Sequence, residues 1–235
     1  MDGFKGQTVC EGAAEGRIAL YTREDVNTFS TTADQTDEMA RFDCAKQLAM
    51  EQIDCLEACM RTAAGDAAAA IFSVHRMLLE DWDYCQQVCE NIERGACAER
   101  AVIQAGRTCA EMFEQMDDPY LRERGADMMD ISTRVAACLA GQEYPCRMDD
   151  EAAVIITEEF YPSEIAVWQR GISRALVSSG GSAYSHASIL AKEIGAPALI
   201  GCSVPLKRLT GEELFGRVHA EKDSGILWLH TKSKL

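Results

Sequence analysis

Residues 174–201 read RALVSSGGSAYSHASILAKEIGAPALIG, and they predict a strand, a turn, a helix and a second strand in succession. The short apolar run at 175–177 is followed by two serines and two glycines. A helix is expected to begin near Ser185 and His186 and to end at Gly195, because small polar residues favour helix starts and glycine favours helix ends. This order of elements is typical of an α/β domain.

His186 lies where the turn meets the expected helix, a position that suits a temporary negative charge. The first backbone N–H groups of a helix have no partner within it, and the helix dipole is positive at that end. A histidine there could carry a phosphoryl group on a ring nitrogen beside these donors. Gly180 and Gly181 leave room for a bulky partner. An ordinary surface histidine would give the same pattern, so both interpretations stay open at this point.

The composition excludes several classes of protein. The chain has 235 residues, of which 47% are hydrophobic, and a net charge of -15. This charge argues against binding to nucleic acid, which requires clustered lysine and arginine. The chain contains no apolar run of the roughly 20 residues needed to cross a bilayer, and its N-terminus does not resemble a signal peptide. We therefore expect a cytoplasmic protein without membrane insertion.

The sequence changes character twice. Residues 6–21 resemble two short strands around a glycine-containing turn, residues 32–141 are helical in pattern, and strand-like runs return after Pro145. The helical part contains four segments with apolar residues spaced by three, four and seven. We expect these segments to form an antiparallel four-helix bundle, whose core accounts for the apolar stripes. Three large members of these stripes are Trp82, Met112 and Met116.

The eleven cysteines allow two interpretations. Cys55 with Cys59, and Cys85 with Cys89, are spaced by four residues and so share a helix face. Two such pairs could form a four-thiolate metal site, although they lack the close spacing of zinc knuckles. Buried, reduced thiols are the favoured interpretation, because each pair falls on an apolar stripe.

Residues 185–201, SHASILAKEIGAPALIG, resemble the active-site signature of the phosphoenolpyruvate-utilising enzymes. Within that group the chain resembles the N-terminal region of Enzyme I of the bacterial sugar phosphotransferase system, phosphoenolpyruvate–protein phosphotransferase. The motifs that carry this second resemblance are VCEGAAEGRIALY (9–21), IFSVHRMLLED (71–81), DDPYLRERGADMMDI (117–131) and YPSE (161–164).

The resemblance implies an α+β fold with two subdomains. Residues 1–31 and 144–235 would form a swivelling phosphohistidine α/β domain of the β/β/α type. Residues 32–143 would form an inserted four-helix α subdomain to which a partner binds.

The resemblance also implies a transferase activity. A phosphoryl group would pass from phosphoenolpyruvate to His186 and then to a histidine of HPr, a small phosphocarrier protein. Phosphoenolpyruvate and Mg²⁺ would bind to a C-terminal barrel beyond Leu235, present in cis or in trans. This chain itself is expected to hold no cofactor or metal.

The residues implied by the resemblance fall into two groups. His186 is the expected phosphoryl acceptor, assisted by Ser185, Tyr161 and Gly181. The second group would form the HPr-binding face and comprises Asp66, Ala70, His75, Met77, Leu78, Tyr84 and Arg124.

Two departures from the family pattern leave alternatives open. Tyr161 replaces a threonine whose hydroxyl orients the active histidine, and Tyr184 replaces another threonine just before the histidine motif. The chain could therefore be a regulatory homologue that binds a carrier without transferring phosphate. It could also be a phosphohistidine domain that serves a dikinase-like or synthase-like enzyme in trans.

Overall fold

The computed structural model describes residues 2–23, 35–145, 151–168, 174–206 and 214–231. The chain divides into two compact units. The barrel unit comprises residues 1–23 and 147–235, and the helical unit comprises residues 24–146. The expected boundary between residues 31 and 32 lies outside the described residues.

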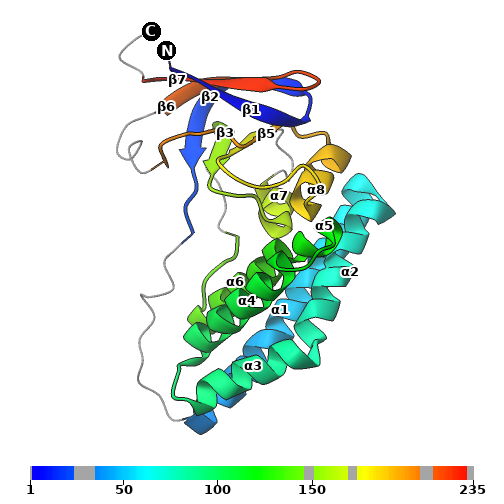
Figure 1. The fold of residues 1–235 in the computed structure, drawn as a ribbon, viewed down its shortest axis with the longest axis vertical. Coiled ribbons are helices and arrows are strands. Elements are labelled where there is room, and N and C mark those ends of the chain that lie inside the picture. Colours follow the sequence, from blue (N-terminus) through cyan, green and yellow to red (C-terminus); the bar gives the residue numbers. More distant parts are fainter. Residues whose placement is uncertain (1, 24–34, 146–150, 169–173, 207–213, 232–235) are drawn as a thin grey trace. The chain divides into compact units, whose positions relative to one another are not determined.

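The barrel unit is a closed barrel of seven described strands (Figure 1). The strands follow the order β1-β5-β4-β3-β2-β6-β7 around it. Neighbours from β2 to β5 pair in parallel, and the other neighbours pair antiparallel. The strands are β1 (Asp2–Cys10), β2 (Gly12–Leu20), β3 (Ala152–Thr157), β4 (Ala175–Ser178), β5 (Ala198–Ile200), β6 (Leu214–Ala220) and β7 (Gly225–Thr231).

Two helices connect the parallel strands, because parallel neighbours require a crossover. Helix α7 (Pro162–Trp168) follows β3, and α8 (His186–Ile194) follows β4. The two helices pack against each other, and Figure 1 shows them side by side. Both therefore begin beyond the carboxyl ends of neighbouring strands.

The parallel strands are apolar along nearly their whole length because they are covered on both faces. All four residues of β4 are buried, as are all residues of β3 except Ala153. The barrel core contains Val154, Ile156, Val177, Leu199, Val218 and Leu227.

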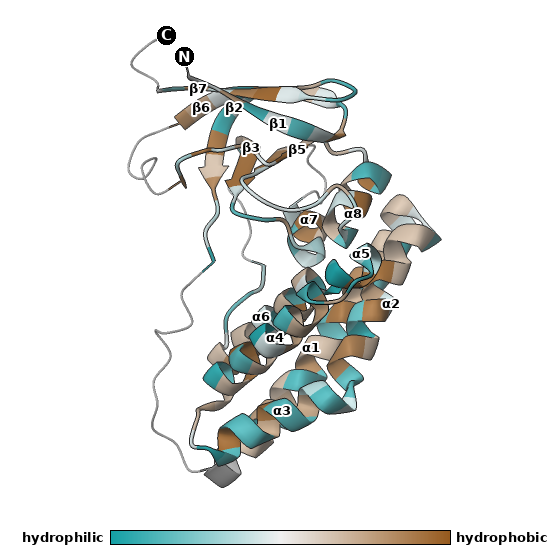
Figure 2. Cartoon of the chain, in the orientation of Figure 1, coloured by the Kyte–Doolittle hydropathy of each residue, from teal (hydrophilic) through white to brown (hydrophobic). Residues whose placement is uncertain are grey.

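The helical unit contains six described helices, on which Figure 2 shows hydrophobic and hydrophilic sides. No helix of the described residues is long and apolar enough to cross a membrane. The helices are α1 (Gln35–Ala64), α2 (Asp66–Glu80), α3 (Trp82–Glu93), α4 (Ala98–Glu114), α5 (Pro119–Arg122) and α6 (Arg124–Ala140).

The expected fold of an inserted four-helix subdomain on a swivelling α/β domain is wrong. The strands close into a barrel, and six helices replace the four. One expected helix divides at Asp81, whose extended backbone (φ -61°, ψ 131°) ends α2. The Asp81 carboxylate then accepts a hydrogen bond from the Tyr84 amide at 3.0 Å and so begins α3. The last expected helix divides at Glu123 into α5 and α6.

The two N-terminal strands do not pair with each other. β1 pairs with β5 and β7, whereas β2 pairs with β3 and β6. The beginning of the chain is thus integrated into the sheet that contains the 174–201 stretch.

Candidate functional site

His186 is the first residue of α8, and Ser185 is the residue that caps this helix. The backbone of Ser185 is extended, and its side-chain oxygen accepts a hydrogen bond from the Ser188 amide at 3.2 Å. The predicted helix start is therefore confirmed. His186 is half-buried, so part of the residue is open to solvent.

A network of serines fixes the turn before His186. The Ser182 carbonyl accepts hydrogen bonds from the Ser185 hydroxyl at 3.0 Å and from the Ser188 hydroxyl at 2.6 Å. The Ser182 hydroxyl accepts a third bond, from the Tyr184 amide at 3.2 Å. Gly181 has a φ of +95°, a backbone conformation that residues with a side chain rarely adopt. The turn is therefore held in one conformation that depends on Gly181.

Backbone bonds tie this turn to the loop that follows β3. The Ser179 amide donates to the Thr157 carbonyl at 3.1 Å, and the Gly180 amide donates to the Glu158 carbonyl at 2.8 Å. The loops before α7 and α8 thus lie together beyond the carboxyl ends of β3 and β4. Ligands of parallel sheets commonly bind at such an edge.

Tyr161 precedes α7 and is held by a buried ion pair. Its amide donates to the Glu164 carboxylate at 3.0 Å. The Arg23 guanidinium binds both oxygens of Glu164, at 2.8 and 2.7 Å, and donates to the Glu159 carbonyl at 2.7 Å. The same guanidinium lies 3.5 Å from the centre of the Tyr161 ring. The role of Tyr161 in orienting His186 stays a prediction.

Tyr184 presents a large aromatic ring to solvent, two residues before His186. Its exposed fraction is 81%, so the ring contributes little to the core of the barrel unit.

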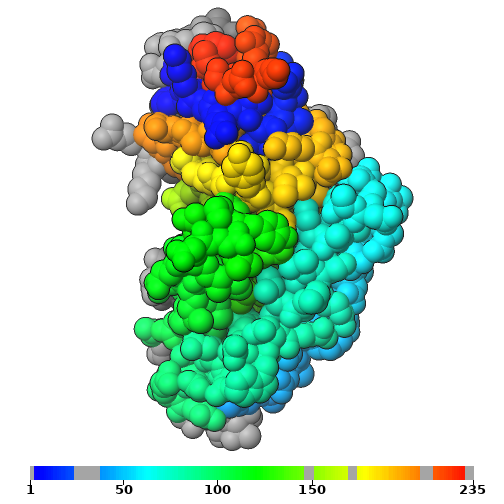
Figure 3. Space-filling view, turned by 45° about the vertical axis from the view of Figure 1, so that its right-hand side comes forward, coloured from blue at the N-terminus to red at the C-terminus, as the bar shows by residue number. Residues whose placement is uncertain are grey.

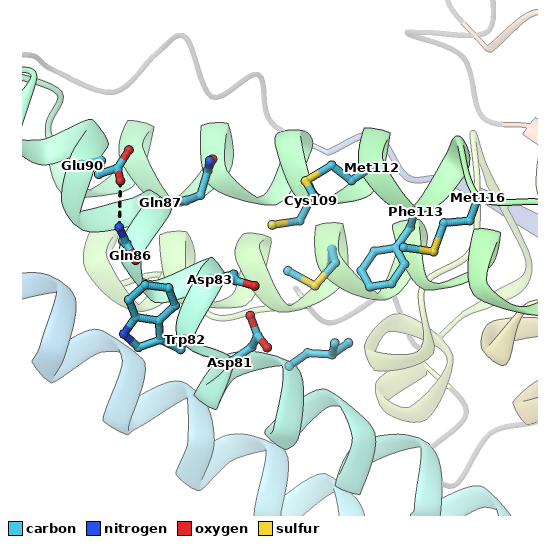
Figure 4. Close-up of a pocket in the computed structure, with 12 residues that line it drawn as sticks. Asp81, Trp82, Asp83, Gln86, Gln87, Glu90, Cys109, Met112, Phe113 and Met116 are labelled. Atoms are coloured by element: carbon cyan, nitrogen blue, oxygen red, sulfur yellow. Dashed lines mark hydrogen bonds between the residues drawn. The ribbon is translucent and has the colours of Figure 1, made fainter.

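The helical unit has a groove of about 600 Å³ between α3 and α4 (Figure 4). Figure 3 shows the face of this unit to which α2, α3 and α4 contribute. The lining combines methionine and aromatic side chains with carboxylates and two glutamines. It comprises Leu78, Asp81, Trp82, Asp83, Gln86, Gln87, Glu90, Cys109, Met112, Phe113, Met116 and Met128.

The carboxylates give the groove a negative potential. Burial raises the pKa of the Cys109 thiol, and the charges of Asp81 and Asp83 raise it further. An apolar floor beside acidic side chains is complementary to a partner that presents an apolar patch among basic residues.

Four of the predicted partner-binding residues lie on α2 and are accessible. Asp66, Ala70 and Met77 are exposed, and their spacing of four and seven places them on one face of the helix. Leu78 is half-buried and lines the groove. Whether a partner binds to these residues stays a prediction.

Two other predicted partner-binding residues are inaccessible. His75 is 0% exposed and Tyr84 is 1% exposed, because both point into the core of the helical unit. Direct contact between either side chain and a partner is therefore not possible in this structure, and the prediction needs correction. Arg124 retains 12% exposure of its side chain.

The sequence pattern placed three groove residues in the core, and this was wrong. Trp82, Met112 and Met116 are 72%, 60% and 37% exposed. On α4, a Cβ atom on Gly106 would lie 2.3 Å from the Ser132 hydroxyl oxygen, so α4 and α6 approach closely where glycine meets serine. Val102 and Ile103 of α4 are buried, whereas Met112 faces outward.

No disulfide joins two of the described cysteines. Cys55 and Cys59 are exposed, which contradicts their expected burial, and Cys85 and Cys89 are half-buried. Among the described residues, no group of three or more His, Cys, Asp or Glu side chains could hold a metal ion. The four-thiolate alternative therefore has no support in this part of the chain.

The chain matches two family descriptions. Residues 5–124 match "PEP-utilising enzyme, N-terminal", and residues 149–215 match "PEP-utilising enzyme, mobile domain".

Similar proteins carry the name phosphoenolpyruvate-protein phosphotransferase. That of Enterococcus faecalis is 30% identical over 202 residues, which cover 84% of this chain and 35% of the relative. That of Lactococcus lactis is 31% identical with the same coverage. The chain spans about a third of the length of these curated relatives.

Solved structures show the same fold. A solution structure of Enzyme I superposes with a TM-score of 0.69 at 25% identity, covering 98% of this chain and 94% of that one. An N-terminal domain titled "Enzyme 1 - Nitrogen" gives a TM-score of 0.63 at 21% identity and indicates the fold alone. The matches confirm the resemblance predicted from the motifs.

Proposed function

Because the chain belongs to the family of phosphoenolpyruvate-utilising enzymes, we propose that it transfers phosphoryl groups through a phosphohistidine at His186. The donor would ultimately be phosphoenolpyruvate, and the acceptor would be the histidine of an HPr-like carrier of a sugar phosphotransferase system. In each transfer the bond between phosphorus and the donor atom breaks as a new bond forms between phosphorus and a ring nitrogen. In the reverse step the phosphoryl group passes from the carrier histidine back to His186.

The observation that carries this proposal is the position of His186 at the capped start of α8. The Ser185 cap binds the Ser188 amide and fixes the start of the helix at His186. A phosphoryl group on the ring would be stabilised by the positive end of the helix dipole. Transfer between two imidazoles needs little proton transfer, so positioning and charge stabilisation would supply most of the rate.

The groove of the helical unit is the proposed docking face for the carrier. Its apolar lining and the carboxylates of Asp81, Asp83 and Glu90 suit a carrier whose active histidine is surrounded by basic residues. The exposed side chains of Asp66, Ala70 and Met77 on α2 would extend this face.

Use of phosphoenolpyruvate would require a further domain. The relatives are about three times as long as the matched region, since the match covers 35% of their length. A phosphoenolpyruvate-binding barrel with Mg²⁺ would act in cis or in trans. This chain alone would perform the exchange between His186 and the carrier.

The test is to mix the chain with a ³²P-phosphorylated HPr-like carrier. We expect acid-labile, base-stable label on the wild-type chain and none on His186→Ala. A variant of the exposed His219, His219→Ala, is the matched control and should accept label normally.

A second candidate function follows from Tyr161 and Tyr184. The packed Tyr161 ring and the exposed Tyr184 ring stand where the family pattern has threonines. If they block transfer, the chain would bind the carrier without accepting phosphate and act as a regulatory protein. Carrier binding measured by calorimetry, without label on the chain, would favour this alternative. If the chain neither binds the carrier nor accepts label, the result would favour a phosphohistidine domain that serves a dikinase-like enzyme in trans.

A further inference from the structure

His75 lies at the centre of a buried polar cluster in the helical unit. Its Nε2 atom lies 3.2 Å from Oδ1 of Asp127, and its Nδ1 atom lies 3.8 Å from Oδ2 of Asp130. The ring of Phe72 packs edge-on against it, with ring centres 5.6 Å apart. Asp130 also accepts a hydrogen bond from the Tyr144 hydroxyl at 3.1 Å. The two carboxylates and the histidine are at most 1% exposed.

Asp127 connects this cluster to the surface. Its second oxygen, Oδ2, accepts a hydrogen bond from the Arg124 guanidinium at 3.4 Å. Arg124 in turn donates to the Tyr120 hydroxyl, and its guanidinium lies 4.9 Å from the centre of the Tyr120 ring. Tyr120 is 57% exposed. One carboxylate thus joins a buried histidine to an arginine whose side chain is 12% exposed.

The cluster and the groove share two helices, α2 and α6. Arg124 and Met128 are four residues apart on α6, and His75 and Leu78 are three apart on α2, so each pair shares a helix face. Met128 and Leu78 both line the groove. A change at Asp127 would act first on Arg124, with which Asp127 is in direct contact.

We propose that His75 and Asp127 are positioning residues that hold Arg124 in place to bind the carrier. This inference rests on the proposed function, in which the carrier docks on this unit. An arginine side chain loses much rotamer freedom when it is fixed by a partner. The ion pair with Asp127 fixes it before docking, and the His75 contact fixes Asp127. Preorganisation of this kind increases affinity without adding a contact to the partner.

The test compares the affinity of an HPr-like carrier for several variants of the whole chain. Asp127→Asn should weaken binding about tenfold, the scale of a typical interface residue. In an Arg124→Gln background the same change should cause no further loss, because Asp127 acts through Arg124. His75→Gln keeps a donor and should bind the carrier more tightly than His75→Leu.

Ser132→Ala is the matched control for damage to the core. Ser132 is on the same helix, is 0% exposed and bonds to the Tyr84 hydroxyl at 3.1 Å. Its replacement should lower stability but leave carrier affinity unchanged. If Ser132→Ala weakens binding as much as Asp127→Asn does, or if the losses from Asp127→Asn and Arg124→Gln simply add, the inference is overturned.

The arginine Nη–H signals in NMR spectra test the anchoring without a partner, because Nη1 is the atom that donates to Asp127. The signal missing in Arg124→Gln identifies Arg124. We expect it to be protected from solvent exchange in wild type and in Ser132→Ala, and at least tenfold less protected in Asp127→Asn. Unchanged protection in Asp127→Asn would refute the anchoring. A wild-type chain that shows this protection but does not bind the carrier would instead refute the proposed function.

Discussion

The amide of Ser188 donates a hydrogen bond to the side chain of Ser185 at 3.2 Å, and His186 is the first helical residue after this cap. The relationship fixes where the helix begins and therefore where the positive end of its dipole lies. It also connects the fold to the proposed chemistry, because a phosphoryl group on His186 would lie at that helix end.

Replacement of Ser185 by alanine tests the importance of the cap. The variant loses the bond from the Ser188 amide and the bond to the Ser182 carbonyl. We expect the free energy of unfolding to fall by about 1 kcal/mol, and phosphoryl transfer to slow because the helix start is less well ordered. Ser185→Thr keeps the hydroxyl and should retain most of both properties. Denaturant unfolding measures the stability, and the rate of phosphoryl transfer measures the activity. If Ser185→Ala equals wild type in stability and in transfer rate, the cap does not have the proposed importance.

Arg23→Gln tests the buried ion pair beside Tyr161. Glu164 is 0% exposed, so the variant leaves a buried carboxylate without its main partner. The free energy of unfolding should fall by about 3–5 kcal/mol. The matched control is Arg17→Gln, whose partner Glu151 is 75% exposed, and the expected loss is within about 1 kcal/mol. The free energies of unfolding are measured in urea. Equal losses for Arg23→Gln and Arg17→Gln would contradict the prediction.

Trp82→Ala tests the groove as the carrier-binding face. The indole is 72% exposed and lines the groove, and exposed tryptophans that become buried in an interface often dominate its energy. Carrier affinity should fall about thirtyfold, which corresponds to about 2 kcal/mol. Leu48→Ala removes another exposed apolar side chain outside the groove lining and should bind normally. Calorimetric titration that finds the same affinity for both variants would exclude this face.

The buried thiol of Cys202 should make the stability of the barrel unit depend on pH. Burial raises the pKa of its thiol from 9.0 to about 11, so the thiol ionises at lower pH in the unfolded chain than in the folded one. The stability from this neutral thiol is complete below pH 9 and is lost as the pH rises through about 11. The difference in unfolding free energy between wild type and Cys202→Ala should shrink over this range. A difference that is constant with pH would contradict the prediction.

The local features around His186 could be predicted because their signals are local. Ser185 and Gly195 mark the two ends of α8, and the structure has a cap at the first and a left-handed φ of 74° at the second. The apolar runs of β4 and β5 flank this helix in the expected order. Strand, turn and helix therefore follow from neighbouring residues alone.

Closure of the barrel could not be predicted in the same way. Hydrophobic patterns indicate strands but do not identify their partners, and the barrel closes through the pairing of β1 with β7, which lie at opposite ends of the chain. The break at Asp81 was missed because the apolar spacing continues across it. The side chain of Asp81 can end one helix and cap the next, a choice that depends on tertiary packing.

The groove and the buried cluster around His75 could be predicted from the sequence only in part. The burial of His75 agrees with its position, four residues after Ile71 and four before Leu79, both of which are buried. Its partner Asp127 lies 52 residues away, and no sequence spacing connects them. The exposure of Met112 became clear only from the close approach of α4 to α6 at Gly106.

The most direct measurement is the amount and chemical stability of phosphate on the purified chain after reaction with phosphorylated carrier. We predict one phosphate per chain, lost in acid but retained in base, located by peptide mapping on the imidazole of His186. Phosphate on another side chain, or no phosphate on a chain that demonstrably binds the carrier, would contradict the central claim.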